Sequence, residues 1–145
     1  METVSDQLPV YKAGKYLTFR VARQELAINS EHVRGILPMH EMVSFDSPSE
    51  WIRGFVPVGG RDVPVIDLRL KLRIARGLHG RDPLLIVVEI EGRLVAFVAD
   101  YVSEVLDLRQ RDFWQGAIRI AGRPRRILDP AQIISEEDWP AALIP

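Results

Sequence analysis

The side chains that commonly carry catalysis or bind metals are few in this chain, and their spacing fits neither chemistry. The three histidines, His32, His40 and His79, lack the four-residue spacing with which two histidines on one helix bind zinc. Loop serines such as Ser44 and Ser47 stand outside the G-x-S-x-G turn that presents a nucleophilic serine. The chain has no cysteine, which excludes disulfides, thiolate metal sites and cysteine nucleophiles. The sequence therefore predicts a protein that is not an enzyme and that holds no metal or cofactor.

Two aspartates follow predicted strands, and we expect structural roles for both. Asp67 ends a strand and is expected to form an ion pair with Arg69 or Arg61 rather than to act as a catalytic acid. Asp100 follows an apolar strand, where a carboxylate that caps a turn is the expected arrangement. These interpretations make binding, not catalysis, the predicted activity.

The charge balance excludes whole classes of partner. With 19 basic and 20 acidic residues the net charge is −1, which gives no electrostatic basis for binding nucleic acid or an anionic membrane. Basic residues cluster at 69–81 and 123–126; we interpret them as solvated loops, with a patch for phosphate or an acidic partner as the alternative. The N-terminal residues lack the basic and apolar regions of a signal peptide, and no apolar run approaches membrane-spanning length. A cytoplasmic protein without direct membrane insertion is the expectation.

The elements that would position binding groups are organised around one predicted β-hairpin. Its strands are residues 55–58 and 63–68, and its turn is 59–62, where two glycines supply positive φ without steric cost. Pro57 and Pro64 cannot donate to a strand ladder, so each belongs at an edge, a strand start or a bulge. A proline on each arm predicts a hairpin that crosses between two sheets.

A second hairpin is predicted around the dipeptide Glu91-Gly92. Residues 83–90 are almost continuously apolar, which is typical of a strand buried on both faces. Gly92 can take positive φ in a two-residue turn, and residues 93–99 pair back. The remaining predicted strands cover 16–21, 26–28, 42–45, 117–120 and 125–128, and residues 102–108 are predicted as a strand or a bulged turn.

Two short helices are predicted among these strands. The first is capped by Asn29 or Ser30, presents an apolar stripe of Val33, Ile36 and Leu37, and ends before a proline. The second covers 129–134 and begins with an aspartate and a proline.

Short strands with turns every 8–12 residues predict an all-β barrel or sandwich. We expect a flexible arm over residues 1–14, one domain over 15–138 and a tail over 139–145. A barrel of roughly 60–70 residues is marginal alone, so two packed barrels that share a core are favoured over independent domains.

Three blocks of the sequence resemble the CheW-like adaptor domains of bacterial chemotaxis and twitching-motility systems. The first is I-x-G…G-x-x-x-P-V-I-D-L-R, formed by Ile52, Gly54, Gly60 and residues 64–69. The second is LLIVVEIEGRLVAFVADYVSEVL, and the third is the N-terminal YLTFRVARQELAINSEHVRGIL. Their order and spacing make the match specific, and together they cover most of residues 16–134.

The resemblance implies two intertwined five-stranded SH3-like barrels with two or three short helices. It also implies a non-catalytic scaffold in chemotaxis-type signalling that couples a chemoreceptor to a histidine kinase. One partner would be the regulatory domain of that kinase, and the other the cytoplasmic tip of a methyl-accepting chemoreceptor.

Candidate partner-binding residues follow from the same resemblance, which puts the kinase-facing surface on the second lobe. The kinase-side candidates are Pro64, Val65, Ile66, Val98, Val102 and Val105. The receptor-side candidates are Arg34, Val58, Gly59 and Arg61. The glycines expected at structural turns are Gly54, Gly60 and Gly92.

The chain departs from the family pattern on the receptor side. The family usually has N-L-R-G where this chain has residues 57–60, so Pro57 replaces the asparagine and Gly59 the arginine. Gly35 replaces a frequent acidic residue in the first predicted helix. These differences leave two alternatives open: an adaptor of a pilus-motility or other non-flagellar array with altered or lost receptor binding, and a small-molecule-binding barrel with an interior cavity.

Overall fold

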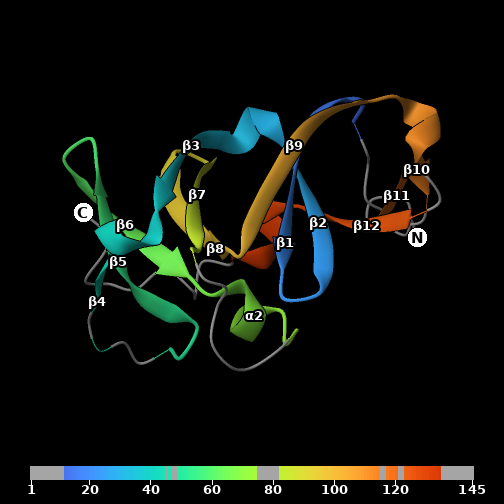
Figure 1. Cartoon of the computed structure of the whole chain (residues 1–145). Coiled ribbons are helices and arrows are strands. Elements are labelled where there is room, and N and C mark those ends of the chain that lie inside the picture. The colour runs from blue at the N-terminus through green and yellow to red at the C-terminus, as the bar shows by residue number, and fades with distance from the viewer. Residues whose placement is uncertain are drawn as a thin grey trace, which may run out of the picture.

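Two six-stranded sheets, here called sheet A and sheet B, form the described part of the chain (Figure 1). The computed structural model describes residues 12–44, 46, 49–74, 82–114, 117–120 and 123–134. Sheet A has the order β10 (Phe113–Trp114), β11 (Ala117–Ile120), β12 (Arg123–Leu128), β2 (Gln24–Asn29), β1 (Gly14–Val21) and β9 (Tyr101–Leu108). Sheet B has the order β3 (Val33–Pro38), β7 (Leu84–Ile90), β8 (Arg93–Ala99), β6 (Arg61–Ile66), β5 (Ile52–Val58) and β4 (Val43–Ser44).

The helices in these ranges are single turns between strands. They are the 3-10 turns η1 (Ser30–His32), η2 (Met39–Glu41) and η3 (Gln110–Asp112) and the α-helices α2 (Leu68–Lys71) and α3 (Pro130–Ile133). The predicted all-β class with short helices is confirmed, with six strands in each sheet rather than five. The predicted tail, most of the predicted arm and residues 75–81 of the basic cluster lie outside the described residues and stay predictions.

Each half of the chain supplies strands to both sheets: β1 and β2 lie in sheet A and β3–β6 in sheet B, whereas β7 and β8 lie in sheet B and β9–β12 in sheet A. The hairpin of β1 and β2 continues through η1 into β3, which pairs with β7 in sheet B. The hairpin of β7 and β8 continues into β9, which pairs with β1 in sheet A. In Figure 1, β9 arches from β8 to the end of the molecule that holds β10. The two lobes are therefore intertwined, as predicted.

Both sheets must curl, because a short link joins their outermost strands. Residues 39–42 connect β3 to β4, and residues 109–112 connect β9 to β10. The outer strands of a flat six-stranded sheet lie about 24 Å apart, whereas a four-residue link spans less than roughly 20 Å even when extended. The described strand pairs leave these edges unpaired, so the barrels are open and η2 or η3 bridges each gap.

Strand alternation divides the buried side chains among three clusters. On β7, Leu85 and Val87 face the interior of the sheet B lobe, whereas Ile86 and Val88 face a central core between the sheets. Sheet A contributes to that central core in the same way, and its other face packs within its own lobe. The central core contains Leu17, Phe19, Val21, Leu26, Ile28, Ile52, Ile66, Leu68, Ile86, Val88, Ile90, Val95, Phe97, Ala99, Leu128 and Ile134. Neither sheet can therefore lose its partner without exposing the apolar side chains that it contributes to the central core.

The predicted two-residue turn at Glu91-Gly92 is confirmed, whereas the predicted four-residue turn at 59–62 is wrong in length, because Gly59 and Gly60 alone form the turn and β6 begins at Arg61. Gly59 and Gly60 have φ of 56° and 80°, and Glu91 and Gly92 have 49° and 84°. This geometry matches the twist of the flanking strands, and glycine adopts it without strain.

The prediction that the central hairpin crosses between sheets is wrong, because β5 and β6 both lie in sheet B. Pro57 lies beyond the stretch of β5 that pairs with β4. Pro64 lies before the stretch of β6 that pairs with β8. Each proline thus has a strand neighbour on one side only, where its missing N–H costs no ladder hydrogen bond.

The first predicted helix is also wrong beyond its first turn. Asn29 caps η1 by accepting from the Glu31 N–H at 3.0 Å, but β3 begins at Val33. A register shift between Val33 and Gly35 breaks the strand alternation, so the apolar spacing imitates a helical one. The predicted strand through residue 68 is wrong at its end, because Asp67 caps α2 by accepting from the Arg69 N–H.

Phe97→Ala is expected to destabilise both lobes together by about 3–5 kcal/mol, because Phe97 is fully buried in the central core. Denaturant unfolding followed by tryptophan fluorescence and by circular dichroism should show one shifted, coincident transition. The exposed Ile36→Ala variant is the control. Separate transitions for the two probes in Phe97→Ala would contradict a core that the lobes share.

Candidate protein-binding surfaces

The polar residues of two separate sequence blocks meet at the junction of the lobes. The Arg69 guanidinium donates to Asp100 Oδ2 at 2.9 Å, and the exposed fractions of the two side chains are 10% and 8%. The same carboxylate oxygen accepts from the Ala22 N–H at 2.6 Å. Arg69 lies in α2, Asp100 joins β8 to β9, and Ala22 is in the turn between β1 and β2. This buried cluster therefore ties a helix that follows sheet B to a turn of sheet A.

The roles predicted for the two aspartates are confirmed as structural, with different partners. Asp100 caps a turn, but that turn lies 78 residues away in the sequence. Asp67 accepts from the Arg53 guanidinium at 2.8 Å and from the Arg69 backbone N–H at 3.0 Å. The predicted alternative partner, Arg61, lies at the opposite end of β6. Both carboxylates serve as acceptors for fixed donors, as cap and ion-pair residues do.

The buried hydroxyl of Tyr16 also has a structural role. Burial raises the pKa of Tyr16 above its usual value of 10.0. Its hydroxyl donates to the Lys12 carbonyl at 2.7 Å, and its ring packs edge-on against Phe113. Within the described ranges, no group of three or more histidine, aspartate and glutamate side chains is placed to hold a metal ion. No helix in those ranges is long and apolar enough to span a membrane.

The kinase-side candidates do not form one surface. Val65, Ile66 and Val98 are at most 2% exposed, and they face the sheet B core or the central core. Val102 is partly buried against the central core, whereas Val105 is 54% exposed. Both lie on β9 of sheet A, while the other candidates, including the buried Pro64, lie in sheet B. Val105 is therefore the candidate whose side chain is available to a partner.

The receptor-side candidates gather at one end of sheet B, here called the turn end. β6 runs parallel to β8, and β3 is antiparallel to β7, so Arg34, the Glu91 turn and the Gly59 turn share that end. Arg34 and Arg61 are exposed, and Arg34 forms an ion pair with Glu89 at 3.0 Å. The turn end thus presents two arginines, one of them neutralised by a neighbouring carboxylate.

Three exposed apolar residues were absent from the predicted sites: Ile36, Val43 and Tyr101, with 43%, 47% and 55% exposure. All three lie on edge strands, which sequence alternation alone does not identify. Ile36 resembles Val105 in its setting, because each lies beyond a register shift on an edge strand. Ile36 pairs with Ile86 in sheet B, as Val105 pairs with Leu17 in sheet A. Each sheet therefore exposes an apolar side chain on an edge strand beyond a register shift.

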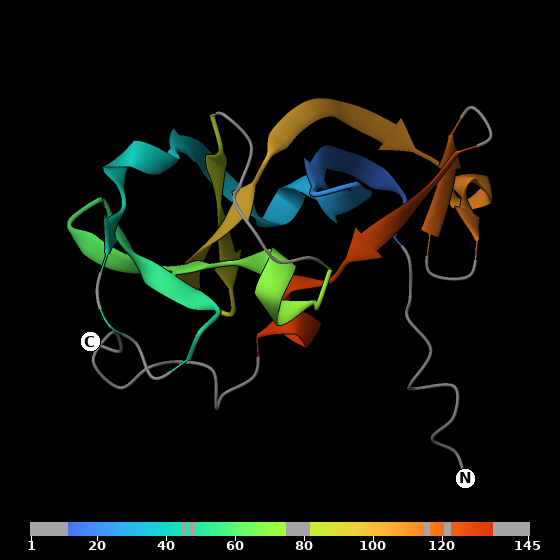
Figure 2. The ribbon, with the colours of Figure 1, turned by 60° about the horizontal axis from the view of Figure 1, so that its bottom comes forward.

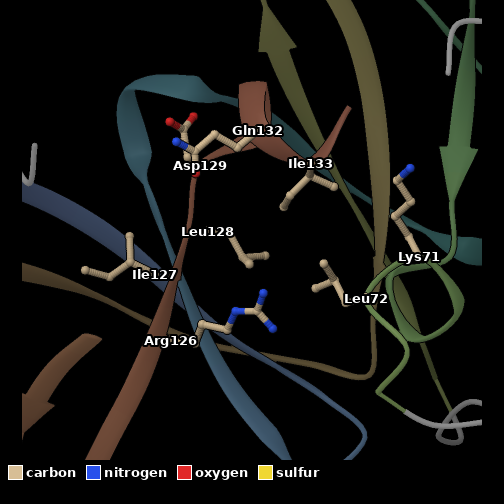
Figure 3. Close-up of a pocket in the computed structure, with 8 residues that line it drawn as sticks. All are labelled: Lys71, Leu72, Arg126, Ile127, Leu128, Asp129, Gln132 and Ile133. Atoms are coloured by element: carbon tan, nitrogen blue, oxygen red, sulfur yellow. The ribbon is translucent and has the colours of Figure 1, made fainter. Parts of the chain in front are cut away.

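The described surface includes the following two hollows. One, of about 330 Å³, lies between η2 and the start of β7 and is lined by Pro38, Met39, His40, Asp82, Pro83 and Leu84. The other, of about 340 Å³, lies between α2, β12 and α3 (Figure 3). Both are of a size that accommodates a side chain or small ligand.

Gly54 and Gly35 have different roles from those predicted. Gly54 lies inside β5 rather than at a turn, and a Cβ there would collide with the Val43 carbonyl and lie 3.0 Å from Ser44 Cα. Gly35 lies in β3, and a Cβ there would have no atom within 4 Å. Gly54 thus permits the close approach of β4, whereas nothing in the packing requires glycine at position 35.

Asp100→Asn is expected to destabilise the fold by about 3–5 kcal/mol, because it leaves the Arg69 charge buried without its partner. Glu89→Gln removes the same type of pair at an exposed position and should cost less than about 1 kcal/mol. Urea unfolding of both variants measures the difference. Equal losses of unfolding free energy in the two variants would show that burial does not increase the contribution of the Arg69–Asp100 pair to stability.

Gly54→Ala should lower the free energy of unfolding by about 1–3 kcal/mol, because β4 must shift away from β5. Gly35→Ala is the matched control and should be neutral or slightly stabilising. Thermal unfolding distinguishes them, and a tolerated Gly54→Ala would mean that β4 is not held in close contact.

Comparisons with known proteins agree with this geometry. The chemotaxis protein CheW of Rhizobium meliloti (strain 1021) is 24% identical over 156 residues, covering 90% of this chain and 98% of that protein. The CheW of Klebsiella aerogenes is 29% identical over 108 residues, covering 74% of this chain and 65% of its own.

The scaffolding protein TtCheW from Thermoanaerobacter tengcongensis has the same fold in its crystal structure. The TM-score is 0.78 at 19% identity, covering 95% of this chain and 97% of that one. The family model of the CheW-like domain matches residues 15–138, which span both sheets. The chain belongs to the CheW-like domain family of chemotaxis scaffold proteins.

Proposed function

We propose that this protein is a cytoplasmic, non-catalytic adaptor that binds a chemotaxis-type histidine kinase and a chemoreceptor at the same time. The observation that carries the proposal is the family match over residues 15–138. The structural use of Asp67 and Asp100 supports it, because these carboxylates serve the fold rather than a reaction. The partners are the regulatory domain of the kinase and the cytoplasmic tip of the receptor.

The shape of the molecule supports a bivalent mechanism. The central core joins the lobes, and each lobe exposes an apolar side chain, Ile36 on β3 and Val105 on β9. Two partners held on one rigid body have a raised effective concentration for each other. Such an adaptor transmits a signal as a change in the relative placement of its partners.

The turn end is the proposed receptor-binding surface, and we propose that it differs from that of most family members at position 59. Gly59 has φ of 56°, and a Cβ there would meet no atom within 4 Å, so an arginine would project freely into solvent. Its absence leaves the exposed Arg61 as the nearest cation on the same turn. We infer a receptor contact altered from that of most family members, as expected in a pilus-motility or other non-flagellar array.

The small-molecule alternative has less support. It requires a cavity inside a barrel, whereas the interior of the sheet B lobe is filled by buried side chains that include Val56, Val63, Leu85 and Val87. The hollows described above lie at the surface between elements.

Val105→Asp is expected to weaken binding of the kinase regulatory domain at least 10-fold in titration calorimetry, because it places a charge in an apolar contact. Ile36→Asp places the same charge at an exposed apolar residue on an edge strand of the other sheet and should alter the affinity less than about 3-fold. If only Ile36→Asp lowers the affinity for the kinase regulatory domain, the kinase-binding surface lies on sheet B instead. No saturable binding of the unaltered protein at about 100 μM would reject the adaptor proposal.

Gly59→Arg is expected to strengthen binding to a chemoreceptor tip, because it restores a planar guanidinium at the turn end. The cost of a non-glycine residue at positive φ, about 1 kcal/mol, is small enough for the hairpin to persist. Gly59→Lys is the matched control, with charge but without the guanidinium fork. Unchanged receptor affinity in both variants would remove the reason for calling this surface divergent.

A further inference from the structure

The hollow between α2, β12 and α3 lies at the end of sheet B opposite the turn end. β6 begins at the turn end with Arg61 and leads into α2 at its other end. In Figure 2, α2 (green) and α3 (red) lie beside each other below the junction of the lobes. The hollow is lined by Lys71, Leu72, Arg126, Ile127, Leu128, Asp129, Gln132 and Ile133. Its walls come from both halves of the chain, and it is separate from the receptor-side and kinase-side candidates.

Arg126 is the charged group aimed at this hollow. Figure 3 shows its guanidinium pointing toward the space between Leu72, Leu128 and Ile133. Arginines such as Arg34, Arg53, Arg69 and Arg125 form ion pairs with carboxylates, whereas the described residues give Arg126 none. An arginine beside an apolar floor, rather than over a carboxylate, leaves its donors available to a ligand.

The other charged side chains that line the hollow, Asp129 and Lys71, already have interactions within the protein. Asp129 caps α3 by accepting from the Ala131 N–H at 3.1 Å. The Lys71 ammonium lies 4.3 Å from the centre of the Trp51 ring, as in a cation–π contact. Asp129 also lines the hollow, and its negative charge disfavours a ligand with several negative charges, such as phosphate. A ligand with one carboxylate next to an apolar group matches the single guanidinium of Arg126 and the apolar residues beside it.

We propose that this hollow is a third contact surface, which binds an acidic segment of a partner protein. A glutamate or aspartate of the segment pairs with Arg126, and a neighbouring apolar side chain packs on Leu72, Leu128 and Ile133. The balanced net charge of −1 disfavours a polyanion such as nucleic acid. This contact goes beyond the adaptor function, because neither proposed partner surface includes these residues.

The test is a titration of the ¹⁵N-labelled full chain with acetyl-Leu-Glu-Leu-amide and acetyl-Leu-Gln-Leu-amide, followed by amide chemical shifts. We expect saturable shifts at residues 71–72 and 126–133, with a Kd on the order of millimolar. The glutamine peptide should bind at least about 5-fold more weakly, because it lacks the carboxylate. Equal affinity for both peptides, or shifts elsewhere, would overturn the proposal.

Substitution of Arg126 tests whether its guanidinium selects the carboxylate, and hexanoate tests whether a peptide is needed. Arg126→Gln should abolish the preference for glutamate, and Arg23→Gln, at an exposed arginine of the turn between β1 and β2, should preserve it. An unchanged preference in Arg126→Gln would overturn the proposal. Hexanoate provides the carboxylate and the apolar body without a peptide. If hexanoate binds as tightly as the glutamate peptide, the hollow is a site for small organic acids rather than for a protein segment.

Discussion

The buried ion pair between Arg69 and Asp100 is the interaction on which the arrangement of the two lobes depends. A charged pair removed from water is costly unless its geometry is good and its remaining bonding capacity is used. One oxygen of Asp100 accepts from both Arg69 and the Ala22 N–H, which offsets part of the hydration that the carboxylate loses. Because the three residues come from distant parts of the chain, the pair is formed only when both lobes are in place.

The central core likewise requires both lobes, because both sheets contribute apolar side chains to it. β7 and β8 bury residues on both faces, one set in the sheet B lobe and one set against sheet A. The chain also crosses between the sheets after each hairpin: β1 and β2 of sheet A lead into β3 of sheet B, and β7 and β8 of sheet B lead into β9 of sheet A. The resulting body is suited to an adaptor, since a scaffold that fixes the geometry of two partners must resist deformation between its binding surfaces.

Local chemistry made several elements predictable from sequence. Glycine at positive φ marked the Gly59-Gly60 and Glu91-Gly92 turns, and the Asn29 cap and Asp129-Pro130 start were correctly placed. β3 was not predictable in this way, because a register shift at Val33 gave a strand the apolar spacing of a helix. Tertiary pairing with β7 decided its conformation against the local pattern.

The candidate surfaces were less predictable than the fold. Family resemblance pointed to Val65 and Val98 as partner contacts, but strands buried on both faces leave such side chains no access to a partner. The exposure of Ile36 and Val105 follows from edge positions that depend on strand order. The hollow around Arg126 requires α2 and α3, which are about 60 residues apart in the sequence, to meet in space. These features arise from long-range topology, which a single sequence does not state.

The central claim is that one rigid copy holds both partners at once. Sedimentation velocity of this protein mixed with the kinase regulatory domain and a receptor-tip fragment, each at about 50 μM, tests it most directly. The account predicts a species that contains all three proteins and sediments faster than either pairwise complex. If each partner instead displaces the other and only pairwise complexes form, the two surfaces are not independent and the adaptor account is contradicted.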